Sequence, residues 1–461
     1  MIIIGAGPAG LAAARWLTSR NFQPRIYEAH SALGGQWSWT NPNSGIWPQM
    51  VSNTVREVTC FSDLDFPINT PHFPHNTAVG QYLEDFATQF AIRERITFNT
   101  RLVHLEKAGD DWALTLKTND TIISDSAPRV VIATGRFNAP SIPHIRGDID
   151  FSGSLGIAHS FNYKDPMAYC DKRVAVLGGS ISALEIASDL AMLGAASVHL
   201  CQRRQRYVNP KMFLGTPIEH RLFTYRRGRL ALDDPEALLR DSEAKILEHA
   251  GDPSRYGTPK PHSDFAKAGA TGSQHYLNLV AEGRVNPYPW PDRIDGQCLH
   301  FLDAQPIEVD GIVAGTGFRL DLPFLSDDLK TTLKLTEAGI ELDEFTFHPD
   351  IPGLALLGLW EQAGSYFTPL EQQARFLAYT WSGERPRPKA DMIKGIGNCA
   401  EKGHHQKPHI QAEMALRFAR LCGTDPGFGK GQQAISDLDP YIVTGALFRT
   451  VGPDRLGPNR E

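Results

Sequence analysis

The sequence predicts an α/β fold with two Rossmann-like units, the second inserted into the first. Two observations predict it. A buried apolar strand followed at once by a glycine-containing turn and a helix occurs at the start of the chain and again near residue 175. An apolar strand that ends in Thr-Gly also occurs twice, at residues 129–135 and 309–318. We interpret the second of these strands as the return of the chain to the first unit.

The first ten residues, MIIIGAGPAG, carry the first motif. Three isoleucines predict a buried strand, and Gly5, Gly7 and Gly10 follow as G-x-G-x-x-G before a helical run. Gly5 permits the tight turn, Gly7 lets a pyrophosphate approach the backbone, and Gly10 lets the helix pack closely on the strand. The free N–H groups at the helix start favour phosphate. The expected dinucleotide contacts in this loop are Gly5, Gly7, Pro8, Ala9 and Gly10.

A ribose-binding acid is expected at the end of the second strand, residues 25–27. Glu28 stands there, close to the spacing at which a carboxylate binds ribose hydroxyls and repels a 2′-phosphate. Asn21 is expected to end the intervening helix in a left-handed conformation. A glycine-rich turn that binds nothing is the alternative, and the flanking strand, helix and acid argue against it.

Three later segments are candidates for the flavin site. Gly35, Gln36 and Trp37 suit a loop along the middle of a flavin, because glycine permits close approach and the indole supplies a flat wall. Ser52 and Asn53 follow, and the Asn53 amide can donate and accept at once. Taken alone, these segments also suit ordinary turns. The expected strand at 129–133 ends in Thr134 and Gly135, where open sheets bind ligands, although a plain strand exit is the alternative.

The second motif is degenerate. Ser180 stands in place of the second glycine and Ala183 in place of the third. After the next strand, Arg203 and Arg204 stand where the first unit has its acid, and arginine accommodates the 2′-phosphate of NADPH. A solvated basic loop is the alternative. The expected contacts are Gly178, Ser180, Ile181, Ser182, Ala183, Arg203 and Arg204.

The rest of the chain gives coarser expectations. A helix is expected at 80–90, and strands at 96–98, 103–105 and 112–116 are expected to form a small antiparallel meander. We interpret 206–310 as the remainder of the second unit plus loops over the active site. After a buried strand at 354–358, a helix that opens at 371 is expected to face the flavin ring with its N-terminus, which makes Gln373 a candidate contact.

Composition excludes several classes of function. The net charge of −6 gives no reason to expect nucleic acid or an anionic membrane, and no apolar run could span a bilayer. The N-terminus is already a core strand, so no signal peptide is expected. The six cysteines are scattered without C-x-x-C, which argues against a dithiol centre or a zinc site and fits a reduced compartment. We therefore expect a cytoplasmic protein with no metal, no nucleic-acid partner and no membrane partner.

The order of these motifs resembles the class B flavin-containing monooxygenases. The likeness includes Phe61 to Asp63, Thr316 to Phe318, and His159 with Ser160, although the family's F-x-G-x-x-x-H spacing is longer here by two residues. The resemblance implies FAD and NADPH as cofactors, with the NADPH domain inserted into the FAD domain. It places the FAD domain at 1–165 and 306–450, the NADPH domain at 166–305, and a flexible tail at 451–461. It also places Gln36, Trp37, Ser52 and Asn53 along the flavin and Val103 at its adenosine end.

The resemblance further implies a mechanism. Oxygen adds to the reduced flavin at C4a, and the hydroperoxide gives its distal oxygen to an amine nitrogen or a sulfur. Asn53 is the expected catalytic residue, near the nicotinamide and the oxygen adduct. The expected partners are a small-molecule substrate and molecular oxygen, with a homodimer as one option for assembly.

Three alternatives remain at this level. A Baeyer–Villiger monooxygenase uses the same intermediate as an anion against a ketone. A pyridine-nucleotide disulfide reductase shares both nucleotide domains but requires a close cysteine pair, and Leu359 stands here where that fold places Gly-Asp. A non-enzymatic nucleotide-binding protein is the third.

Overall fold

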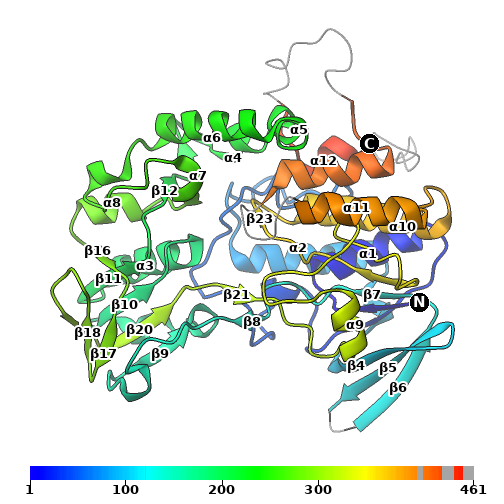
Figure 1. Cartoon of the computed structure of the whole chain (residues 1–461), viewed down its shortest axis with the longest axis horizontal. Helices are drawn as coiled ribbons and strands as arrows, with labels where there is room; N and C mark the ends of the chain where they lie inside the picture. Colours follow the sequence, from blue (N-terminus) through cyan, green and yellow to red (C-terminus); the bar gives the residue numbers. More distant parts are fainter. Residues whose placement is uncertain (120, 402–408, 428–440, 450–461) are drawn as a thin grey trace.

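The first unit is built on a five-stranded parallel sheet in the order β22-β7-β1-β2-β3 (Figure 1). The computed structural model describes residues 1–119, 121–401, 409–427 and 441–449, so the tail predicted at 451–461 lies outside the described residues. The strands of this sheet are β1 (Ile2–Ile4), β2 (Arg25–Tyr27), β3 (Ile96–Thr97), β7 (Val130–Ile132) and β22 (Leu354–Leu356).

Both faces of this sheet are covered. Figure 1 shows α1 (Pro8–Thr18), α2 (Asn76–Gln89) and α10 (Phe367–Ser382) on one side. On the other side lies a three-stranded antiparallel meander, and buried residues of β1 contribute to the cores on both sides. This double burial explains why the first strand consists of isoleucines alone. The meander strands are β4 (Thr100–Ala108), β5 (Asp111–Thr118) and β6 (Thr121–Ala127).

Two local predictions have different outcomes. The left-handed helix end is confirmed: Asn21 has φ 64° and its N–H donates to Thr18 O, while Phe22 N–H donates to Leu17 O. The meander is correct for the later strands, but β3 pairs in parallel with β2 and belongs to the first sheet. A two-residue strand carries no signal for its partner, because pairing is decided by distant residues.

The second unit has its own five-stranded parallel sheet, in the order β16-β11-β10-β20-β9. Its strands are β9 (Gly156–His159), β10 (Arg173–Leu177), β11 (Ser197–Gln202), β16 (Asn286–Pro289) and β20 (Gly311–Ala314). The interpretation of 309–318 as a return to the first unit is therefore wrong, because β20 pairs with β10 and β9. A buried strand that ends in Gly-Thr-Gly fits either sheet equally well by sequence. The chain returns to the first sheet only with β22.

The two sheets are joined by a short antiparallel pair. Figure 1 shows β8 (Ala139–Pro140) and β21 (Phe318–Arg319) running side by side between them. The other short strands form small sheets of two or three strands, separate from the two five-stranded sheets. They are β12 (Tyr207–Asn209) with β15 (Ala270–Gly272), β13 (Met212–Phe213) with β14 (Thr216–Pro217), β17 (Arg293–Asp295) with β18 (Cys298–His300) and β19 (Ile307–Glu308), and β23 (Gln362–Ala363) with β24 (His409–Ile410).

Much of the region predicted as loops is helical. Helices α4 (Glu219–Leu222), α5 (Tyr225–Asp233) and α6 (Pro235–His249) lie above both units, and α5 packs on α12 (Gln411–Cys422) of the first unit (Figure 1). A Cβ at Gly228 of α5 would lie 2.8 Å from Ala412 O, so glycine permits this close approach. The remaining helices are α3 (Ile181–Leu193), α7 (Phe265–Ala268), α8 (Tyr276–Ala281), α9 (Asp327–Thr332) and α11 (Lys389–Glu401). Among the described residues no helix is both long and apolar enough to cross a bilayer.

The buried hydroxyl of Tyr82 should contribute measurably to the stability of the fold. The Phe61 N–H donates to the Tyr82 hydroxyl at 2.7 Å, and this hydroxyl donates to Leu64 O at 2.9 Å. Tyr82→Phe leaves both backbone groups without this partner inside the core of the first unit. We expect the free energy of unfolding to fall by about 1–3 kcal/mol. Chemical denaturation with an unchanged m-value checks this, and an unchanged midpoint would contradict it.

Candidate active site

The first glycine loop lies at the carboxyl edge of the first sheet. A Cβ at Gly5 (φ 103°) would lie 2.5 Å from Ala133 O, and a Cβ at Gly10 would lie 1.9 Å from Gly5 O. These approaches require glycine on steric grounds. The next turn along the chain also contacts the loop, since Gly34 N–H donates to Ala6 O at 2.9 Å. Pro8 and Ala9 form the first turn of α1, whose N–H groups face the same edge.

Glu28 is held firmly at the end of β2. One carboxylate oxygen accepts the Ala6 N–H at 2.7 Å, and the other accepts the His30 N–H at 2.9 Å. The side chain is buried and lies beside the glycine loop. Each oxygen keeps a further lone pair, so the carboxylate can still accept hydrogen bonds from ribose hydroxyls. Nearby, Val103 lies at a bulge of β4, where the pairing with β5 shifts register.

The loop at residues 34–46 is fixed by one amide. Gln36 Nε2 donates to Asn43 O at 3.0 Å and to Phe137 O at 2.9 Å, and Gln36 Oε1 accepts the Gly45 N–H at 3.0 Å. Gly35 has φ 57°, and a Cβ there would lie 3.0 Å from Gly7 Cα. Trp37 ends this short 3₁₀ turn and packs partly against the core of the first unit. Gln36 therefore holds its own loop and the segment after β7 in one arrangement.

Two residues of the expected site have buried polar atoms without partners. Asn53 Oδ1 and Thr134 Oγ1 are both buried, and neither has a hydrogen-bond partner among the described residues. Ser52, in contrast, uses its hydroxyl to hold the turn, donating to Thr54 O at 2.8 Å. Gly135 follows with φ 80°, and a Cβ there would meet open space. Buried unpaired groups of this kind point to a missing polar ligand or water.

The second glycine loop repeats the first in geometry. A Cβ at Gly178 (φ 130°) would lie 2.4 Å from Gly315 O, and a Cβ at Gly315 would lie 2.8 Å from the Ala183 backbone. Ser180 is the N-cap of α3 and has extended backbone angles. Its side chain, with those of Ile181 and Ser182, is exposed at the helix start. The loop thus presents free N–H groups at the carboxyl edge of the second sheet.

The two expected arginines are exposed just beyond β11. The Arg203 guanidinium lies 4.5 Å from the centre of the Trp290 ring, and Arg204 Nη1 donates to Lys267 O at 2.9 Å. Both side chains therefore have positions supported by neighbours while their remaining donors face solvent.

A protein-family profile described as flavin-binding monooxygenase-like matches residues 1–417. The chain belongs to this family. It is an NADPH-dependent flavin monooxygenase, and its cofactors are FAD and NADPH.

One relative in sequence and two solved structures illustrate what this chain is similar to. Dimethylaniline monooxygenase [N-oxide-forming] 2 of Rattus norvegicus is 26% identical over 416 residues, covering 87% of this chain and 76% of the relative. S-allyl-L-cysteine S-oxygenase from Allium sativum has a TM-score of 0.66 at 21% identity, over 92% of this chain and 88% of that chain. Cyclohexanone monooxygenase has a TM-score of 0.70 at 17% identity, over 93% and 98%. At these identities the two solved structures show a shared fold.

The residues of this monooxygenase fit both cofactors. The first loop combines steric room for a pyrophosphate with a buried carboxylate for ribose, and the second combines a helix N-terminus with arginines. The unpaired oxygens of Asn53 and Thr134 could accept hydrogen bonds from a polar ligand. All six cysteines of this monooxygenase lie among the described residues as free thiols, so no disulfide is seen there.

The predicted start at 371 of the helix that carries Gln373 needs a correction. Helix α10 begins at Phe367, so Gln373 lies in its second turn and is completely buried. Its Oε1 accepts the Gly358 N–H at 3.0 Å, and its Nε2 donates to Phe345 O at 2.9 Å. The side chain therefore braces α10 against the end of β22, and a contact between Gln373 and the flavin stays a prediction. Pro369 explains the late helix start predicted at 371, because proline is tolerated throughout a first helical turn.

His159 links two neighbouring strand ends of the second sheet. It ends β9 and is buried, and burial lowers its pKa. The Phe161 N–H donates to its Nδ1 at 3.2 Å, so its Nε2 carries the proton and donates to Gly317 O at 3.0 Å. The side chain thus ties the end of β9 to the segment that follows β20.

Sequence reasoning missed two groups. Gly315 allows the start of α3 to pack closely on the strand that precedes this glycine. Its position directly after a buried apolar strand is the sequence feature that could have identified it. Lys164 contacts the loop at 44–46, and no pattern in the neighbouring sequence predicts this contact.

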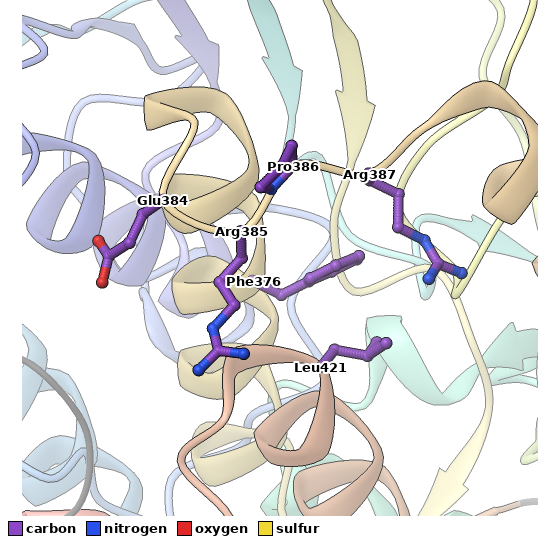
Figure 2. Close-up of a pocket in the computed structure, with 6 residues that line it drawn as sticks. All are labelled: Phe376, Glu384, Arg385, Pro386, Arg387 and Leu421. Atoms are coloured by element: carbon purple, nitrogen blue, oxygen red, sulfur yellow. The ribbon is translucent and has the colours of Figure 1, made fainter.

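A cavity of about 520 Å³ lies away from these loops, at the C-terminal end of α10 (Figure 2). Arg387 there pairs with the buried Asp343 at 2.6 Å. Figure 2 shows the Arg385 guanidinium pointing in a different direction from that of Arg387. Since the other end of α10 approaches the nucleotide loop, we assign this cavity no part in the monooxygenase reaction. Its lining residues are Phe376, Glu384, Arg385, Pro386, Arg387 and Leu421.

Proposed function

We propose that this monooxygenase oxygenates an amine nitrogen or a sulfur of a small molecule. The carboxyl groups that surround the turn after Asn53 carry this proposal. Glu219 is buried, accepts a hydrogen bond from the Val55 backbone, and lies close to Glu57. In both glutamates Oε2 is buried and has no partner within the described part of the chain.

These carboxyl groups favour one substrate chemistry over another. Burial raises the pKa of Glu219 to about 7, with the neighbouring Lys211 opposing the rise. In its ionised form, a carboxylate stabilises the positive charge that develops on an amine nitrogen or a sulfur as it attacks oxygen. It disfavours the anionic oxygen nucleophile that attacks a ketone. The names of the N-oxide-forming relative and the S-oxygenase support the same choice.

The residues have separate tasks in this proposal. When bound, the flavin supplies the redox and oxygen-activating chemistry. Glu28 holds the ribose of FAD, and the loops around Gln36 and Thr134 exclude water from the reacting centre. Asn53 presents its amide to the reacting atoms as the catalytic residue. Arg203 and Arg204 hold the 2′-phosphate of NADPH.

A substrate panel tests the proposal. The purified protein is loaded with FAD and given NADPH, oxygen and matched sets of tertiary amines, thioethers and cyclic ketones. We expect N-oxides or sulfoxides in amounts that match the NADPH consumed. A protein that binds FAD but turns over only the ketones would establish the Baeyer–Villiger alternative, which the cyclohexanone monooxygenase fold keeps in view. A protein that takes up no FAD would contradict the whole assignment.

Coenzyme preference tests the arginines. In Arg203→Gln/Arg204→Gln we expect the preference for NADPH over NADH, measured as kcat/KM, to fall by about 10- to 100-fold through a higher KM for NADPH. Use of NADH should stay nearly constant, because NADH lacks the 2′-phosphate. Arg255→Gln, at an exposed site elsewhere in the same unit, is the matched control. Equal use of both coenzymes by the unaltered protein would contradict this role.

A further inference from the structure

The two units meet at a set of contacts between residues 43–47 and residues 161–164. Lys164 Nζ lies 2.7 Å from Ser44 O, 3.0 Å from Ser44 Oγ and 2.7 Å from Ile46 O. The Trp47 and Tyr163 rings form an edge-to-face pair with centroids 5.8 Å apart. We call these two segments the clasp.

Each side of the clasp continues into one cofactor motif. In the first unit, Gly45 N–H donates to Gln36 Oε1, and Gln36 fixes the loop expected along the flavin. In the second unit, the Tyr163 hydroxyl donates to Asp189 at 2.8 Å, and Asp189 lies on α3, the helix that begins at the second glycine loop. An unbroken series of described contacts therefore links the two motifs.

We propose that Lys164 is a positioning residue that holds the flavin loop in register with the NADPH helix. The inference rests on the cofactor placement proposed above. Hydride transfer depends on the relative position of two bound rings, and a misplacement of about 1 Å can cost about 100-fold in rate. Three oxygen acceptors converge on one Nζ, so the ammonium can satisfy all three with its three donors.

The strength of the clasp depends on whether the Lys164 amine is protonated. Burial lowers the pKa of Lys164 to about 8, and no charged residue contributes to that shift. The groups that face Nζ are the Ser44 and Ile46 carbonyls, the Ser44 hydroxyl and the Trp39 ring at 5.9 Å. The titratable neighbours along its own segment are Tyr163 and Asp165. A neutral amine keeps two donors for the two carbonyls but no longer carries a charge, so the hydrogen bonds of the clasp weaken as pH rises through about 8.

The test compares Lys164→Met with Lys164→Arg and with Lys107→Met. Lys107 is the matched control, because its exposed ammonium also donates to a carbonyl, that of Asp110, and also lies over a tryptophan ring. In the FAD-free protein, we expect hydrogen exchange of peptides covering 39–47 to be faster in Lys164→Met than in the unaltered protein. In the FAD-loaded protein, we expect anaerobic reduction by NADPH to be about 10-fold slower. Lys164→Arg should restore most of the rate, and Lys107→Met should leave both measurements unchanged.

A pH profile separates positioning from general stability. The reduction rate of the unaltered protein should fall above pH about 8, whereas Lys164→Arg should show no such step because arginine stays charged. If Lys164→Met does not fold, Lys164→Gln, which keeps two donors, carries the same comparison. Exchange and reduction rates equal to those of Lys107→Met would overturn the inference. Failure of the unaltered protein to bind FAD or to be reduced by NADPH would instead overturn the cofactor placement.

Discussion

Replacing Asn53 by leucine should lower the rate of product formation by about 100-fold while FAD stays bound. The amide has a buried oxygen with no partner within the described residues, and we propose that it lies at the reacting centre. Leucine has the same branched arrangement of heavy atoms but offers neither donor nor acceptor. Loss of one preorganised hydrogen bond at a reacting centre costs about 100- to 1,000-fold in rate.

The measurement must separate oxygen transfer from coenzyme oxidation. We expect Asn53→Leu to be reduced by NADPH within about twofold of the normal rate and to release hydrogen peroxide in place of oxygenated product. Asn278→Leu, at an exposed position of α8, controls for the loss of an amide elsewhere. Normal oxygenation by Asn53→Leu would remove Asn53 from the reaction.

The nucleotide loops could be predicted from sequence because their strand-turn-helix pattern is local. Gly10 is required by the backbone of Gly5, five residues before it, whereas Gly5 and Gly178 also meet the backbone of a neighbouring parallel strand. Asn21 takes the left-handed conformation expected of it, since a helix end is decided within a few residues. Where strand, turn and helix follow one another directly, short-range sterics fix both the fold and the position of the site.

What sequence reasoning missed depends on partners that are far apart in sequence. β20 has the composition of a strand of either sheet, and only its pairing with β10 decides the matter. Gln373 is polar and near a helix start, yet its hydrogen bonds go to residues that precede it by 15 and 28 positions. Lys164 and Ser44 are 120 residues apart. Spacing along the chain says nothing about such contacts, which depend on the finished packing.

Two glycines of the first loop should separate folding from cofactor binding. In Gly10→Ala the new Cβ would lie 1.9 Å from Gly5 O, which is backbone and cannot move aside cheaply. We expect a loss of about 3 kcal/mol or more in the free energy of unfolding, and little FAD in the purified protein. Thermal unfolding of the FAD-free protein and flavin absorbance measure the two effects.

Gly7→Ala should behave differently. Gly7 has φ −78°, which alanine adopts readily, and its new Cβ would lie 3.4 Å from Gly35 Cα, so the protein itself tolerates the methyl group. The methyl group would still point into the space expected for the pyrophosphate. We expect unfolding of the FAD-free protein within about 1 kcal/mol of normal and FAD affinity lowered by at least about 10-fold. Normal FAD affinity in Gly7→Ala would place the pyrophosphate elsewhere, because that glycine would then be dispensable for binding as well as for folding.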